Sequence, residues 1–417
     1  MTTPEPHRPR RFGVLRDRHA RPYLLTSGLS MLGDNTEHVL TYWVLWEEFH
    51  SAGLVGFEVV SHWLPYLLLS VPFGALAERY DCRRLVQVAQ GLFMVVSASW
   101  AALILTGTLE VWSACVLLVL HGCAGALWAP AEQLLLHDFA PPAELASAVR
   151  LNATFRGLGS LAGPVVGSVL LFGLGPVPGL LVNVLFYLPM TWVMLRTPFD
   201  GHVRSGYVHR ARLTVKDTFG VVRSVRRDRV LLGMIALTAI IGLCVGGSLQ
   251  VAMPSIAERL GAGSGGIGYG VLLFANGVGG VVGGLVLEAF GAIRPRARAA
   301  VVATVFLGVT SMAVALTSSF AVAILALAAG GVASLVSQSV AQALVQIRAP
   351  IEERGRVVGV FSMFGQGMRT GNGLVLAVLG GAIGVSGALA VGGAALVVGA
   401  VVIGLAVVGR SGDAVRA

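Results

Sequence analysis

A succession of long apolar stretches, separated by short polar connections, constrains this chain more than any other feature of its sequence. A helix needs about 20 apolar residues to cross a bilayer. Such stretches fall near residues 22–46, 53–75, 85–106, 111–136, 145–173, 177–196, 229–255, 266–289, 299–317, 320–346, 355–381 and 385–409. Only 12% of the 417 residues are charged, about half the share in a soluble domain. The sequence therefore predicts an all-α membrane protein with twelve transmembrane helices in two six-helix repeats.

The polar residues divide the chain into five parts. We expect a basic tail over 1–21, a six-helix bundle over 22–196, a hydrophilic linker over 197–228, a second bundle over 229–409 and a tail over 410–417. Arginines concentrate in the tails, the linker and alternate connections, and the opposite side holds only Arg259. Because positive loops stay in the cytoplasm, we expect both termini inside a plasma (inner) membrane. This topology accounts for the net charge of +9, so nucleic-acid binding is not expected.

The two halves of the chain repeat each other at an offset of 209 residues. Under that shift Gln133 falls on Gln342, and Phe155 falls on Phe364. Parallel repeats of this kind place a binding site between the halves, near the middle of the bilayer. We therefore expect the functional residues to lie where the two bundles face each other.

The sequence contains no pattern typical of catalysis, nucleotide binding or metal binding. It has no Gly-Lys phosphate loop, no Ser-His-Asp order and no His-Glu-x-x-His motif. The four cysteines lack metal-ligand spacing and are expected to be packing residues: Cys82, Cys115, Cys123 and Cys244. We expect no enzyme activity, no cofactor and no metal site.

The connection after the second apolar stretch carries a charged motif. Its glycine lets a helix end pack closely, its glutamate is placed to pair with an arginine, and its arginines hold the loop at the cytoplasmic face. The motif consists of Gly74, Glu78, Arg79, Asp81, Arg83 and Arg84, and a degenerate copy runs from Gly284 through Glu288 to Arg296. The alternative is a short charged loop with no further role.

The fifth apolar stretch combines regularly spaced glycines with a proline. Gly159, Gly163 and Gly167 recur every four residues, a spacing that lets helix backbones approach. Pro164 removes an internal hydrogen bond and can kink the helix. Since glycine and proline are frequent in membrane helices, ordinary helix packing is the alternative interpretation.

Both motifs resemble those of the major facilitator superfamily. The loop is similar to the superfamily signature G-x-L-A-D-R-x-G-R-R, with Glu78 in place of Asp and Asp81 in place of the second Gly. Its Asp-x-Arg-Arg ending resembles the drug and siderophore exporter branch, which includes macrolide and enterobactin exporters, and the fifth stretch resembles the antiporter motif of such exporters. The resemblance implies a monomeric efflux transporter that exports a small amphipathic drug, macrolide or siderophore. A proton gradient drives the alternating-access cycle in place of any cofactor.

Two acids in the first apolar stretch are the main candidates for proton coupling. Asp34 and Glu37 share a polar stripe with Ser30 and Thr41, and Asp34 lies near the middle of the predicted helix. Ionisable groups inside a membrane helix are costly and are functional candidates. We expect a proton to bind Asp34, with Glu37 assisting; a permanent ion pair that locks the helix is the alternative.

Two arginines are the expected partners of these acids. Arg156 in the fifth stretch and Arg369 in the eleventh both fall near the middle of the membrane. They either pair with Asp34 or Glu37 and hold an anionic group of the substrate, or fix contacts between helices. Further polar candidates for the substrate site are Asn152, Gln366 and Gln342.

Four other ionisable residues are weaker candidates. Glu58 and His62 share one face of the second stretch, and their nearness to its outer end favours solvated rim positions over a proton relay. His121 and Glu132 lie in the fourth stretch. For each of these four, a purely structural role is the favoured interpretation.

Three other functions stay open at this point. A lipid or lysolipid flippase of the same fold would use the same acids, and its arginines would suit a phosphate head group. A metabolite importer would have the same fold, but the resemblance of the fifth stretch to the antiporter motif would then not indicate export. A membrane sensor or scaffold that transports nothing belongs to a different class and predicts no effect of neutralising the buried charges.

Overall fold

The computed structural model describes residues 12–50, 52–141, 144–202, 215–246, 248–261, 267–290 and 295–408. Residues 1–11 of the predicted tail over 1–21, residues 203–214 of the predicted linker over 197–228, and the whole predicted tail over 410–417 lie outside this part. Every regular element of the described part is helical. The prediction of an all-α fold is therefore confirmed.

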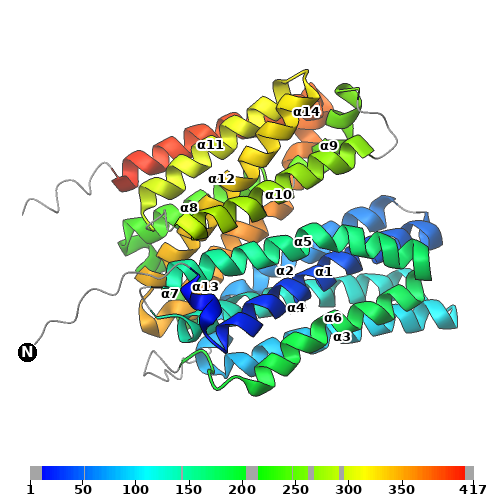
Figure 1. Ribbon diagram of the computed structural model, residues 1–417, viewed down its shortest axis with the longest axis horizontal. Coiled ribbons are helices and arrows are strands. Elements are labelled where there is room, and N and C mark those ends of the chain that lie inside the picture. Colours follow the sequence, from blue (N-terminus) through cyan, green and yellow to red (C-terminus); the bar gives the residue numbers. More distant parts are fainter. Residues whose placement is uncertain are drawn as a thin grey trace, which may run out of the picture.

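Six long helices form the first bundle (Figure 1). After a short turn, η1 (Gly13–Arg16), they are α1 (Ala20–Phe49), α2 (Ala52–Arg79), α3 (Cys82–Thr106), α4 (Val111–Phe139), α5 (Leu145–Leu174) and α6 (Pro176–Arg196). Helix α1 packs on α5 and α6, α2 packs on α4, and α3 packs on α4 and α6. The polar stripe of α1 is thus enclosed by the other helices of its own bundle.

Helix α3 shows how the sequence sets these elements. Asp81 caps its first turn by accepting a hydrogen bond from the backbone N–H of Arg83, and Gly107 ends it in the left-handed conformation at φ 65°, which glycine adopts without strain. Its buried residues recur every three or four positions, as in a helix with one inward face: Val86, Ala89, Gln90, Phe93, Val96, Ser97 and Trp100.

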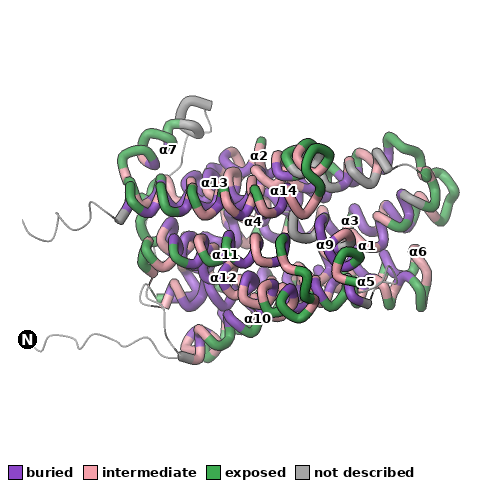
Figure 2. The backbone as a smooth tube through the Cα atoms, turned by 90° about the horizontal axis from the view of Figure 1, so that it is seen from above, coloured by how far each residue is buried: buried purple, intermediate pink, exposed green. Residues whose placement is uncertain are grey.

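The second bundle follows a short amphipathic helix, α7 (Val215–Arg227), which lies at the edge of the molecule in Figure 2 and packs Val221 and Val225 against the second bundle. Its elements are α8 (Arg229–Cys244), α9 (Ser248–Arg259), α10 (Ile267–Phe290), α11 (Ala297–Leu316), α12 (Phe320–Arg348), η2 (Ile351–Glu353), α13 (Arg354–Ser362), η3 (Met363–Gly367) and α14 (Met368–Val408). The predicted span 229–255 is therefore divided into α8 and α9. The last two predicted spans, 355–381 and 385–409, are formed by α13, η3 and α14. The chain turns between these two spans at Gly384, where φ is 76°.

Helices α4 and α12 show the internal repeat most clearly. Both contain 29 residues, and each bound of α12 lies 209 residues after the corresponding bound of α4. The offset found in the sequence is thus the offset between two equivalent helices. Residues of α4 and α12 can be compared position by position.

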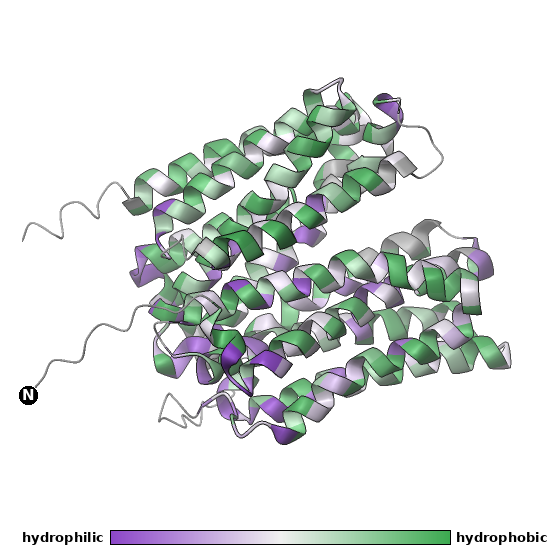
Figure 3. Cartoon of the chain, viewed as in Figure 1, coloured by the Kyte–Doolittle hydropathy of each residue, from purple (hydrophilic) through white to green (hydrophobic). Residues whose placement is uncertain are grey.

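The outer surface of the bundles is apolar (Figure 3). Leu105, Phe172 and Leu405 are more than two-thirds exposed, at 76%, 73% and 70%. Nine helices of the described part are long and apolar enough to cross a membrane by length and composition. A surface of exposed leucine and phenylalanine would be unfavourable in water, so the chain is a multi-pass membrane protein.

The two bundles meet near one end of the molecule, and Figure 1 shows them separating toward the other. Helix α2 contacts α13, and α5 contacts α10. At the first contact a methyl group on Gly74 would strike the carbonyl of Gly355, and one on Gly355 would strike the carbonyl of Gly74. Both residues must be glycine for the backbones to approach this closely. We call this the contact end of the molecule.

Candidate functional site

The two predicted acids of α1 are buried and share one histidine partner on α4. His121 Nε2 lies 2.9 Å from Asp34 Oδ1, and His121 Nδ1 lies 2.9 Å from Glu37 Oε1. Glu37 Oε2 also accepts hydrogen bonds from Asn183, at 3.1 Å, and from Ser97. Both nitrogens of His121 therefore face carboxylates, and in its protonated form this side chain offsets the charge of the two acids.

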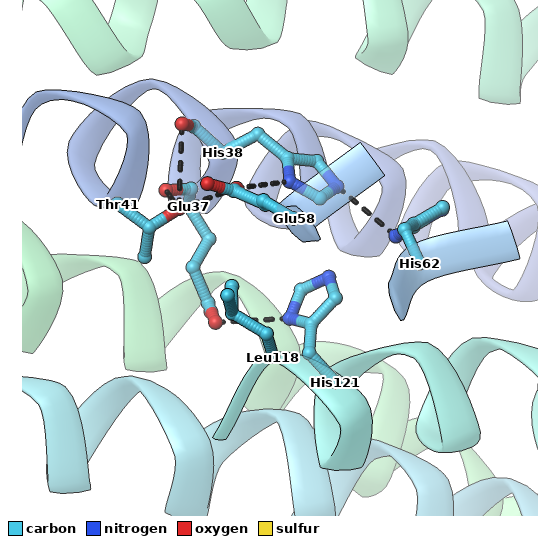
Figure 4. A pocket seen from close by; sticks show the side chains of 7 residues that line it. All are labelled: Glu37, His38, Thr41, Glu58, His62, Leu118 and His121. Atoms are coloured by element: carbon cyan, nitrogen blue, oxygen red, sulfur yellow. Dashed lines mark hydrogen bonds and ion pairs between the residues drawn. The ribbon is translucent and has the colours of Figure 1, made fainter. Parts of the chain in front are cut away.

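A second histidine pair adjoins this one. His38 Nδ1 lies 2.8 Å from Glu58 Oε1, and His38 Nε2 lies 3.1 Å from His62 Nδ1. Thr41 donates to Glu58 Oε1 at 2.7 Å. Figure 4 shows these side chains converging from α1, α2 and α4 around a small cavity. We call Asp34, Glu37, His38, Glu58, His62 and His121 the acid–histidine cluster.

The sequence-based interpretation of Glu58 and His62 as solvated rim residues is wrong. Glu58 is 1% exposed and His62 is 8% exposed. Helix α2 packs along α4 over this stretch, and a methyl group on Gly122 of α4 would strike the backbone of Ser61. This close approach buries the face of α2 that carries both side chains.

A separate polar group surrounds Glu132, further along α4. Its carboxylate accepts hydrogen bonds from Ser27 at 2.7 Å, Asn152 at 3.1 Å and Arg156 at 2.7 Å. The Arg156 guanidinium also lies over the ring of Trp128, 4.3 Å from its centre. Arg156 therefore pairs with Glu132 and not with Asp34 or Glu37, because Glu132 faces it directly from α4; of the two alternatives drawn from the sequence, the contact between helices is the one seen here.

Arg369 has no carboxylate partner among the described residues. Its guanidinium lies over Trp63, 4.6 Å from the ring centre, and its buried Nε lacks a hydrogen-bond acceptor in the described part of the chain. The expected pairing with Asp34 or Glu37 is absent here because His121 already holds both acids. Gln366 in η3 and Gln342 in α12 are half-buried.

Two ion pairs join the bundles at the contact end. Arg356 on α13 donates from Nε to Glu78 Oε2 on α2, at 2.8 Å, and from its backbone N–H to Oε1, at 2.7 Å. Arg150 on α5 donates from Nε to Glu288 Oε2 on α10, at 2.9 Å. All four residues are at most 8% exposed. Each bundle thus contributes one acid and one arginine, in keeping with the internal repeat.

The remaining charges of the loop motif lie at the end of α2 and the start of α3. Arg83 forms an ion pair with Asp81, at 2.7 Å, and bonds the carbonyl of Thr197 at 2.9 Å. Burial acts to raise the pKa of Asp81, but hydrogen bonds from Arg83 outweigh it and hold the pKa below its ordinary value. Arg79 lies over the ring of Tyr80. Arg84 lies in the first turn of α3.

The glycines of the fifth helix lie against α1. A methyl group on Gly159 would strike the carbonyl of Gly28, and one on Gly163 would strike Asn35. Gly167 meets Val39 in the same way, whereas Pro164 is exposed. The glycine stripe therefore sets how closely α5 approaches the helix that carries Asp34.

The sequence analysis missed His38, Arg150 and Arg356. His38 follows Asp34 by four residues, the helical spacing that puts two side chains on one face, so this signal was available. Arg150 precedes the glycine-rich part of the fifth stretch, and Arg356 belongs to the basic connections that set the topology. Their partners lie 138 and 278 residues away, and no local pattern points to such distant acids.

Two helical bundles with an apolar outer surface, internal repeats and buried ionisable groups define a secondary transporter. A family model described as transmembrane secretion effector matches residues 11–415. The chain belongs to this family of the major facilitator superfamily, whose members are transporters and not enzymes.

Comparison with known proteins gives distant relatives. The chain is 23% identical to the staphyloferrin A transporter of Staphylococcus aureus, over 64% of this chain and 66% of that protein. It is 26% identical to an uncharacterized transporter, YfiS, of Bacillus subtilis, over 36% of this chain and 34% of that protein. Both matches span less than two-thirds of the relative. The crystal structure of the human organic anion transporter MFSD10 has the same fold, with a TM-score of 0.72, 14% identity, and coverage of 92% of this chain and 99% of that one.

Proposed function

We propose that the chain exports a small amphipathic molecule, such as a drug, macrolide or siderophore, from the cytoplasm in exchange for protons. The observation that carries the proposal is the burial of Asp34 and Glu37 against His121, inside one bundle of a two-bundle transporter. The name of the family, transmembrane secretion effector, supports export. The basic connections support cytoplasmic termini.

The contact end supports alternating access. The pairs Glu78–Arg356 and Arg150–Glu288 join the bundles at one end, and they must separate for a central site to open there. A proton or a ligand shifts such an equilibrium only by binding one state better than the other. In the proposed cycle, the acids bind protons in one state and release them in the other as substrate binds.

Arg369 supports an anionic group on the substrate. Its guanidinium lies near His62 and Trp63 on the face of α2 that meets the second bundle, and it has no carboxylate partner among the described residues. A half-buried cation without a partner is unfavourable and is ready to bind a carboxylate, phosphate or phenolate. Trp63 beside it offers an aromatic surface for the apolar part of an amphipathic molecule.

The test is proton release from purified, weakly buffered protein when candidate ligands are added. The panel contains cationic drugs, macrolides, siderophores and lysolipids, and compares wild type with Asp34→Asn. Glu258→Gln is the control, since Glu258 is an exposed acid on α9. We expect one class to release protons from wild type and from Glu258→Gln but not from Asp34→Asn. Binding with equal release from all three proteins would contradict coupling at Asp34, and release by lysolipids alone would favour the flippase.

A further inference from the structure

The acid–histidine cluster brings three imidazole rings together inside the first bundle. The ring centres of His38 and His62 are 4.7 Å apart, those of His38 and His121 are 5.0 Å apart, and those of His62 and His121 are 5.6 Å apart. One ligand atom each from these rings and from Asp34 can be chosen so that all four lie within 4.8 Å of one another. Three helices, α1, α2 and α4, supply them.

In His38 and in His121, the two ring nitrogens contact different partners. His38 Nδ1 faces Glu58, and His121 Nδ1 faces Glu37. Their Nε2 atoms face inward, toward His62 Nδ1 and Asp34 Oδ1 respectively, and Figure 4 shows the second nitrogen of His121 directed at the space beside His38 and His62. A carboxylate that holds the outer nitrogen of a histidine is the usual arrangement around a bound metal, where it fixes ring orientation and raises the basicity of the inner nitrogen.

The space between these side chains suits one small ion. Five cluster residues other than Asp34 line the cavity together with Thr41 and Leu118: Glu37, His38, Glu58, His62 and His121. Its volume is about 10 Å³, close to the room that a single buried water needs. Asp34 reaches the inner side of the cluster through its contact with His121 Nε2. Ligands of tetrahedral zinc at roughly 2.1 Å from the metal lie roughly 3.4 Å from one another. The inner atoms would move by about 1 Å or less to reach that geometry, since two of their separations are now 3.1 and 2.9 Å.

The charge of the cluster also fits a cation. Three carboxylates face two of the three histidines, His38 and His121, and Glu58 Oε2 is buried without a hydrogen-bond partner in the described part of the chain. An unpaired buried carboxylate oxygen is costly, and a divalent charge a few ångströms away would offset it. The side chain of His38 is 19% exposed, so the cluster is not completely enclosed by protein.

We propose that His38, His62, His121 and Asp34 bind one divalent transition-metal ion of the zinc type, with Glu37 and Glu58 orienting two of the histidines. Three imidazoles and one carboxylate favour zinc, cobalt, nickel or iron(II) over magnesium and calcium, which prefer oxygen ligands. The ion displaces the protons that the inner nitrogens carry in the hydrogen-bonded arrangement. The sequence-based expectation of no metal site is replaced by this proposal, which shares Asp34 with the proposed function but does not depend on the direction of transport.

The test is titration of the full-length protein, purified without a polyhistidine tag, with Zn²⁺ and with Co²⁺. Bound metal is measured by equilibrium dialysis, and the Co²⁺ site is measured by its visible absorption, which is intense for tetrahedral coordination. We expect one ion per chain and a tetrahedral Co²⁺ spectrum. His62→Gln should abolish both, and Glu58→Gln should weaken Zn²⁺ binding about 10- to 100-fold.

The matched control is His137→Gln, which removes a histidine from the same helix as His121 but outside the cluster. It should bind metal as wild type does. The proposal is overturned if wild type binds no more Zn²⁺ than the double variant His38→Gln/His62→Gln, or if bound Co²⁺ gives an octahedral spectrum that the single variants leave unchanged. The wild-type stoichiometry and spectrum decide the matter even where a variant does not fold. Proton release by organic ligands is measured separately, so loss of one proposal leaves the other standing.

Discussion

The two bundles share one architecture but differ in what they bury. Helices α4 and α12 have equal lengths at an offset of 209, yet His121 of α4 corresponds to Gly330 of α12, and Glu132 corresponds to Ala341. Away from the contact end, the described interior of the second bundle holds neutral polar pairs, such as Thr304 with Ser337 at 2.6 Å.

The internal repeat therefore accounts for the arrangement of the helices. The buried ionisable groups occur where the two halves differ. Equivalent helices conserve length and packing, because both bundles must fill the same kind of interior. The ionisable groups of the first bundle have no counterpart at the matching positions of α12. Only at the contact end do the bundles contribute alike, with one acid and one arginine each.

The largest expected effect is on the free energy of unfolding, and it differs between the interiors of the two bundles. His121→Leu leaves Asp34 and Glu37 buried without their cation, which should lower the free energy of unfolding by about 3–5 kcal/mol. In the second bundle, Ser337→Ala removes one neutral hydrogen bond and should cost about 1 kcal/mol. Chemical unfolding in detergent, followed by tryptophan fluorescence, measures both.

A rescue sharpens this prediction. Combining His121→Leu with Asp34→Asn and Glu37→Gln removes the uncompensated charges and should recover most of the lost stability. If the triple variant is no more stable than His121→Leu, the loss comes from packing, and the electrostatic account of the cluster is wrong.

The next largest effect concerns the contact end, where each bundle contributes one acid and one arginine. Glu78→Gln and Glu288→Gln each break one ion pair between the bundles, and each should favour the separated state by about 2 kcal/mol, or roughly 30-fold. Distances between spin labels on cysteines introduced at Tyr80 and Glu352, in a background without the four native cysteines, report the separation. Both variants should show a similar gain of long distances.

The control for this experiment is Arg348→Gln. Its ion pair with Asp228 lies within the second half of the chain and is more exposed, so the label distances should match wild type. A change in Glu78→Gln alone would mean that the two pairs are not equivalent and that the symmetry of the contact end is only apparent.

A smaller effect tests the glycine stripe between α5 and α1. Gly159→Ala places a methyl group against the carbonyl of Gly28, and overpacking of this kind costs about 1–3 kcal/mol. Gly157→Ala is the matched control, since its methyl group would meet only Val281 at 3.9 Å. Equal unfolding midpoints for the two variants would show that α5 and α1 can move apart freely.

The smallest effect is at Asp81. Asp81→Ala removes the cap of α3 and the pair with Arg83, and should cost about 1 kcal/mol at pH 7. Because folding lowers the pKa of Asp81, its contribution is complete above the ordinary pKa of 3.8 and is lost as the pH falls below that value. The difference in stability between wild type and Asp81→Ala should therefore shrink when unfolding is compared at pH 6 and pH 3.5. A difference that is equal at both pH values would exclude this charge effect.

Much of the fold could be predicted from hydropathy and the internal repeat. The spacing of apolar stretches predicts most of the long helices. It missed helix α7 within the predicted linker, the π-helical turn η3 within the span 355–381, and the division of the seventh span into α8 and α9. That division depends on local packing near Val245 and Gly246, where a methyl group on Gly246 would meet Arg369. Such a contact joins segments more than 100 residues apart and leaves no mark in hydropathy.

The candidate site was predictable only in part. Asp34 and Glu37 were evident because acids in an apolar stretch are rare. Their partner could not be chosen between His121 and an arginine, because the choice depends on how α1, α4 and α5 are rotated about their axes. Glu58 and His62 were misplaced for the same reason, since the burial of their face depends on the close approach of α2 to α4.

The most direct test of the proposed function uses proteoliposomes with an imposed pH gradient and the ligand identified by proton release. Proton antiport predicts that wild type accumulates the ligand on the acidic side. Asp34→Asn should either equilibrate the ligand across the membrane without accumulation or fail to transport it. Accumulation on the alkaline side, in step with protons, would contradict the account, as would accumulation by Asp34→Asn equal to wild type.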